Sequence, residues 1–76
     1  RAKLAAREAE LMNAVTALEQ QIAHIERQME EASYAGDHHK LRELTALYRQ
    51  KRQELERTSE QWAQAAEALA NFQADS

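Results

Sequence analysis

The chain has 76 residues, of which 43% are hydrophobic and 30% are charged, with one Gly, no Pro and no Cys. It is too short for two domains of ordinary size, and without Cys it has neither a disulfide framework nor a Cys-based zinc site. Ten basic and thirteen acidic residues give a net charge of −3, so the overall charge does not by itself attract nucleic acid or an anionic membrane. Ala, Glu, Lys, Leu and Arg make up more than half of the sequence, which is typical of a long helix or coiled coil.

The first half of the chain carries large apolar residues at spacings that alternate between four and three. This is the heptad pattern of a helix that packs along one seam. Its d positions are Leu4, Leu11, Leu18, Ile25 and Ala32, and its a positions are Glu8, Val15, Ile22 and Met29. The pattern predicts a helix over about residues 2–33, in which Glu8 is the one charged member of the seam.

A turn is expected over about residues 34–37. Gly36 is the only Gly of the chain, and it can adopt the left-handed conformation that commonly closes a helix. Asp37 follows and suits the N-cap of a second helix, because its carboxylate can accept hydrogen bonds from the first free amides.

The second half repeats the heptad pattern and predicts a helix over about residues 38–72. Its a positions are Leu41, Tyr48, Leu55, Trp62 and Leu69, and its d positions are Leu44, Lys51, Thr58, Ala65 and Phe72. If the two seams face each other in antiparallel order, the residue numbers of each facing a–d pair add up to 73, which places the fold-back between Gly36 and Asp37. We therefore predict an all-α fold, a two-helix antiparallel coiled-coil hairpin formed by residues 1–76. A continuous helix in a parallel dimer would place Gly36 in a helix interior, at a cost of about 1 kcal/mol.

The sequence offers little for catalysis or metal binding. The only Gly lies in the turn, so there is no phosphate-binding Gly-rich loop, and no Ser has a recognisable base and orienting acid. His38 and His39 point about 100° apart on a helix, and His24 lies far along the axis, so no metal site is expected. No apolar run approaches the roughly 20 residues that span a bilayer. We expect a non-catalytic segment with no cofactor, no metal and no membrane contact.

Basic residues gather in the second predicted helix. This basic stretch comprises Lys40, Arg42, Arg49, Lys51, Arg52 and Arg57. Such a stretch can contact phosphates, with a strong dependence on salt. Lys51 can equally be a polar residue that sets the register of the seam. The competing interpretation of the whole stretch is that Glu19, Glu26 and Glu30 of the first helix neutralise it, with Glu19 facing Arg52.

Several segments resemble the C-terminal coiled-coil domain of ABC-F ATPases of the Uup type. They are Leu18-Glu19-Gln20-Gln21-Ile22, Tyr34-Ala35-Gly36-Asp37, Lys40-Leu41-Arg42-Glu43-Leu44-Thr45 and the late Trp62. The resemblance implies a cytoplasmic, nucleic-acid-binding tail that contacts DNA or ribosomal RNA. It also implies two upstream cassettes of the same chain that bind ATP and carry the ATPase residues.

Two alternative functions belong to other classes of protein. The first is a structural or protein-interaction hairpin that docks to a partner or forms a homodimer without binding nucleic acid. Leu47, at a g position beside the seam, is its candidate contact. The second is the antiparallel arm of an aminoacyl-tRNA synthetase, which shares the architecture but has a loop pattern that we do not find in this chain.

Overall fold

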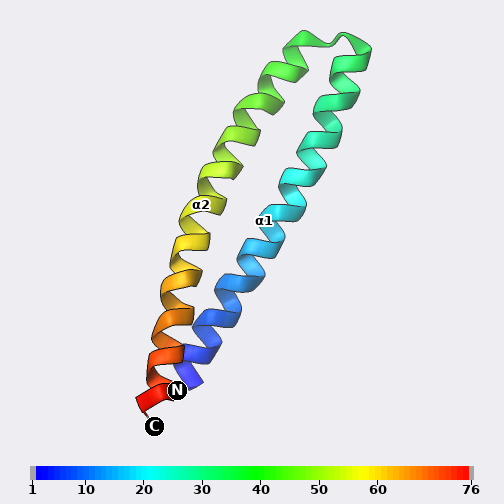
Figure 1. The fold of residues 1–76 in the computed structure, drawn as a ribbon. Helices are drawn as coiled ribbons and strands as arrows, with labels where there is room; N and C mark the ends of the chain where they lie inside the picture. The colour runs from blue at the N-terminus through cyan, green and yellow to red at the C-terminus, as the bar shows by residue number, and fades with distance from the viewer. Residues whose placement is uncertain (1, 76) are drawn as a thin grey trace.

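The computed structural model describes residues 2–75, which form two long helices joined by a tight turn. Helix α1 spans Ala2–Ala35 and helix α2 spans His38–Asp75. Figure 1 shows the helices side by side in antiparallel order, with both chain ends at the end opposite the turn. The rod measures 59 × 14 × 14 Å. The predicted all-α hairpin is confirmed.

Both helices are longer than the sequence predicts. Helix α1 continues two residues beyond the expected end at 33, and α2 continues three residues beyond the expected end at 72. At the turn, the reason is that Tyr34 and Ala35 keep helical geometry until Gly36 reverses the chain. The turn therefore consists of Gly36 and Asp37 alone.

The turn closes one helix and starts the next. Gly36 has φ +69°, and its N–H donates to the carbonyl of Ser33 at 3.1 Å, while the N–H of Asp37 donates to the carbonyl of Ala32 at 2.9 Å. These two bonds form a Schellman motif, which satisfies carbonyls that the end of a helix leaves free. Asp37 Oδ1 accepts a hydrogen bond from the backbone N–H of Lys40 at 3.1 Å, which confirms the predicted N-cap.

The best-packed part of the seam lies next to the turn. Its buried and partly buried members are Ile25, Met29, Ala32, Leu41, Leu44 and Tyr48. They are the members of the three predicted facing pairs nearest the turn, Ala32 with Leu41, Met29 with Leu44 and Ile25 with Tyr48. Their packing in one cluster agrees with the predicted register.

Away from this cluster the hairpin is only thinly covered. Leu11, Leu18 and Ile22 of α1 are buried, whereas Leu44 is the one buried hydrophobic residue in the described part of α2, and Phe72 is 44% exposed. The accessible surface is 5755 Å², against roughly 4,700 Å² for a compact monomer of this mass. Two helices therefore leave one side of each apolar stripe without a third layer.

A long-range hydrogen bond joins the helices near the chain ends. The indole N–H of Trp62 donates to Glu8 Oε1 at 2.8 Å, and both residues are partly buried. Trp62 and Glu8 occupy adjacent layers of the predicted register, so the bond also agrees with it. It gives the one charged residue of the first seam a partner, which lowers the cost of placing that residue there.

We expect Gly36→Ala to destabilise the hairpin by about 1 kcal/mol, because an L side chain is strained at positive φ. No other atoms crowd the position where a Cβ would lie, so the loss reports backbone strain rather than a clash. Urea unfolding followed by circular dichroism at fixed protein concentration measures it. Gly36→Asn is the matched control and should lose less, since Asn tolerates this conformation. Equal losses in the two variants would contradict the explanation.

We expect Trp62→Phe to lower the free energy of unfolding by about 1–2 kcal/mol, because it removes the donor to a charged acceptor while keeping an aromatic ring in the seam. The same unfolding assay applies. Tyr48→Phe serves as the control, since the Tyr48 hydroxyl makes no hydrogen bond within the described residues. A smaller loss in Trp62→Phe than in Tyr48→Phe would show that the indole bond does not stabilise the fold.

Candidate nucleic-acid interface

The basic stretch lies on the half of α2 next to the turn, the green-to-yellow part of the ribbon in Figure 1. Five of its six residues are exposed, and Lys51 is intermediate. Within residues 2–75 the close contacts between a basic and an acidic side chain are His39 with Glu43 at 2.7 Å, which is an ion pair only when the imidazole is protonated, and Lys51 with Glu54 at 3.6 Å. The four Arg side chains and Lys40 therefore have no acidic partner within the described residues.

The structure brings three of these residues together on one side of α2. Arg42 and Arg49 line one shallow groove with His38, Leu41 and Thr45 among its other residues. Arg52 lines the next hollow along the helix. Arg42 and Arg49 occupy b positions and Arg52 occupies an e position, so all three lie on one side of the hairpin. We call Arg42, Arg49 and Arg52 the basic rim.

The other members of the stretch lie elsewhere. Lys40 at g and Arg57 at c belong to the opposite side of α2 by heptad position, so they do not extend the basic rim. The side chain of Lys51 is 27% exposed, and its Nζ lies 3.6 Å from Oε2 of Glu54. Since Glu54 already balances its charge, we expect Lys51 to contribute least to any contact with phosphate.

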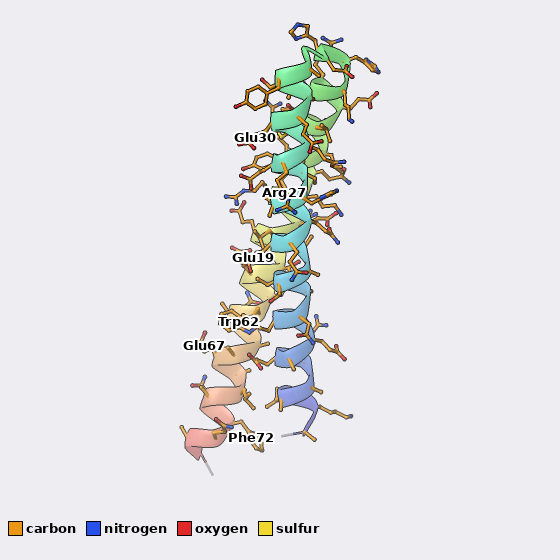
Figure 2. All side chains as sticks on the ribbon, turned by 90° about the vertical axis from the view of Figure 1, so that its right-hand side faces the viewer. Glu19, Arg27, Glu30, Trp62, Glu67 and Phe72 are labelled. Atoms are coloured by element: carbon orange, nitrogen blue, oxygen red, sulfur yellow. The ribbon has the colours of Figure 1, made fainter. Side chains whose placement is uncertain are left out.

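An acidic edge on α1 runs along the same side as the basic rim. It consists of Glu19, Glu26 and Glu30, which we call the acidic rim. Figure 2 shows Glu19 and Glu30 projecting from the side of the hairpin on which Trp62 lies. A groove whose lining includes Glu26 and Glu30 also contains Met29, Leu41 and Tyr48. Because Leu41 also lines the groove of Arg42 and Arg49, the two rims flank one partly apolar strip, and we call this side the groove face.

The two rims do not pair with each other. No ion pair crosses from α1 to α2 within the described residues, and Glu19 makes none with Arg52. The predicted ion pair between Glu19 and Arg52 is therefore wrong. The physical reason is that both groups are exposed and lie on either side of the apolar strip, where a solvated pair is worth only about 0–1 kcal/mol. Neutralisation by direct contact is likewise absent.

The His side chains do not form a metal site within the described residues. His39 contacts Glu43 one turn along α2, and the part of the chain from 2 to 75 contains no cluster of three side chains that could hold a metal ion. Neither helix, over the residues described, has an apolar stretch long enough to cross a bilayer.

The b and e heptad positions already place both rows of charged residues on one side of the hairpin. What the sequence does not indicate is that the two rows stay unpaired, which only the packed hairpin shows. Comparison with protein-family models, curated proteins and solved structures found no match to this chain.

Proposed function

We propose that this chain is a non-catalytic hairpin that binds DNA or RNA through phosphate contacts on α2. The observation that carries the proposal is the set of exposed cations without acidic partners on one half of the helix. A guanidinium that no carboxylate occupies keeps its donors for phosphate oxygens, which it binds in a bidentate manner.

The geometry favours contact with the nucleic-acid backbone over recognition of bases. Arg42 and Arg49 lie seven residues apart, so their attachment points are separated by about 10 Å along the helix. Trp62 and Tyr48, whose side chains are of the type that stacks on bases, are partly buried in the seam. Phosphate contacts fix position without reading sequence. We therefore propose binding that depends on salt and is independent of sequence.

The resemblance to the tails of Uup-type ABC-F ATPases supports the same proposal. On this interpretation the hairpin is a cytoplasmic appendage of a chain whose upstream cassettes bind ATP, and it contributes affinity for DNA or ribosomal RNA. Determining the sequence before Arg1 tests this part, because two cassettes with phosphate-binding Gly-rich loops are expected there. A different upstream domain would remove the family from the proposal and leave the phosphate contacts to be tested separately.

A second candidate is a protein-interaction hairpin. It is favoured by the excess of accessible surface and by Leu47, which is 38% exposed beside the seam. This hypothesis requires no nucleic acid and predicts association that survives high salt, since apolar contacts are not screened.

We expect Arg42→Glu combined with Arg49→Glu to weaken duplex binding at least roughly tenfold near 0.1 M salt, and to reduce the salt slope by about 2. Fluorescence anisotropy with a labelled duplex and a labelled structured RNA, at several salt concentrations, measures both. The control is Arg7→Glu combined with Arg27→Glu, which changes the net charge equally but lies on α1. Equal losses in both double variants would assign the effect to net charge instead of the basic rim.

We expect Arg49→Gln to reduce the salt slope by about 1 and Lys51→Gln to leave it unchanged. The difference follows from the position of Glu54 beside the Lys51 ammonium. The same anisotropy titrations apply. A slope change of the same size in Lys51→Gln would mean that Lys51 leaves Glu54 when nucleic acid binds.

A further inference from the structure

The two rims lie at matching heights along the rod. In the predicted register, Glu30 is level with position 43 of α2, Glu26 with position 47 and Glu19 with position 54. Each acid is thus within two residues of Arg42, Arg49 or Arg52, respectively. At 1.5 Å per residue this offset is at most about 3 Å along the axis. The rows match in height, yet the apolar strip between them keeps them apart within one chain.

Between the rims, the floor of the groove face is apolar and only partly covered. Met29, Leu41 and Tyr48 are each partly buried. Toward the chain ends the same side carries small residues at the b and e positions, together with Met12, which is 42% exposed. These positions are Ala5, Ala9 and Thr16 of α1 and Ser59, Ala63, Ala66 and Ala70 of α2. Small side chains allow another helix to approach closely, but they do not by themselves select it.

We propose that the groove face is a self-association surface whose occupant is a second copy of this chain, related by a twofold axis that runs along the rod. This operation places α1 of one copy against α2 of the other. Each acidic rim then meets the basic rim of the other copy at the same height, and the two apolar strips cover each other. The product is a four-helix bundle in which both turns lie at the same end.

Charge selects this arrangement over the opposite one. If the second copy were turned end for end, its small-residue half would face both rims, and six charged residues of each chain would be covered without partners. Desolvating unpaired charges is costly, whereas opposed rims of opposite sign attract and fix the register. Glu56 is the one acidic residue at a b or e position of α2; it lies one turn beyond Arg52 toward the chain ends and lines the same hollow as Arg52.

The available area is sufficient for a specific dimer. A face of 59 by 14 Å covers on the order of 800 Å², which is what each partner contributes to an interface of standard size. The hairpin also benefits from a second layer, since small domains rarely bury enough apolar surface alone.

Sedimentation equilibrium of the full chain over a range of concentrations tests the proposal. We expect the mass to rise from 8.7 kDa toward twice that value. Glu26→Arg combined with Glu30→Arg should raise the dissociation constant roughly a hundredfold, because like charges then face each other. Adding Arg42→Glu and Arg49→Glu to that variant should restore association. Leu47→Lys, on the other side of the seam, is the matched control and should change nothing. Circular dichroism checks that each variant remains helical.

A monomer at all concentrations would overturn the proposal, and so would a dimer that Leu47→Lys dissociates or that the rim variants leave intact. The outcome is separable from the proposed nucleic-acid binding, because Glu26→Arg with Glu30→Arg removes the dimer while adding positive charge for phosphate. Dissociation with unchanged or tighter nucleic-acid binding supports the interface. A wild-type chain that forms no dimer rejects the interface. If nucleic-acid binding is then lost only in the variant with Arg42→Glu and Arg49→Glu, the proposed phosphate contacts still hold.

A distance between two spin labels tests how the two copies are oriented in the proposed dimer. Tyr34 is 93% exposed beside the turn, and the chain has no Cys, so Tyr34→Cys accepts a single spin label. The predicted dimer gives a distance between labels well below the 59 Å length of the rod. A distance near the full length would show that the copies are end for end and would overturn the proposed twofold axis.

Discussion

The fold-back at Gly36 and Asp37 determines every other relation in this molecule. Because the turn contains two residues and is held by the Schellman bonds to Ala32 and Ser33, the two seams have no freedom to slide. The facing pairs next to the turn follow directly, and so does the meeting of Trp62 with Glu8 at the far end. A one-residue insertion inside the first turn of α2 would rotate the residues that follow it by about 100° relative to the seam, and the rims would no longer lie on one side.

Much of this fold is predictable from the sequence, for reasons that particular residues make clear. The heptads place Leu11, Leu18, Ile22 and Ile25 in the seam, and all four are buried. Gly36 can adopt a positive φ and Asp37 can cap a helix, and both properties follow from the residue type alone. The helix ends were less predictable, because Tyr34 and Ala35 have no stop signal of their own. The Trp62–Glu8 bond depends on two side-chain rotamers and not on periodicity, so the pattern alone did not indicate it.

The candidate site was only partly predictable, since heptad positions describe direction around a helix but not pairing between exposed groups. Glu19 and Arg52 share the e positions of the two helices, which places them on one side without bringing their charges into contact. In water, two long side chains lose rotamer freedom when they pair, and this loss offsets most of the Coulomb attraction. A second surface that displaces water from the groove face changes that balance, because the same pairs are then less screened.

The proposed phosphate contacts and the proposed dimer place competing demands on Arg42, Arg49 and Arg52. The rim cannot bind a carboxylate row of a second copy and a phosphate backbone at once, so the two complexes must exclude each other wherever they share these groups. Both are electrostatic, and both weaken with salt. They differ in the role of the acidic rim, which attracts a second copy but repels nucleic acid. Under these two proposals, Glu26 and Glu30 set the preference between the two partners, although neither residue belongs to the basic stretch that the sequence singles out.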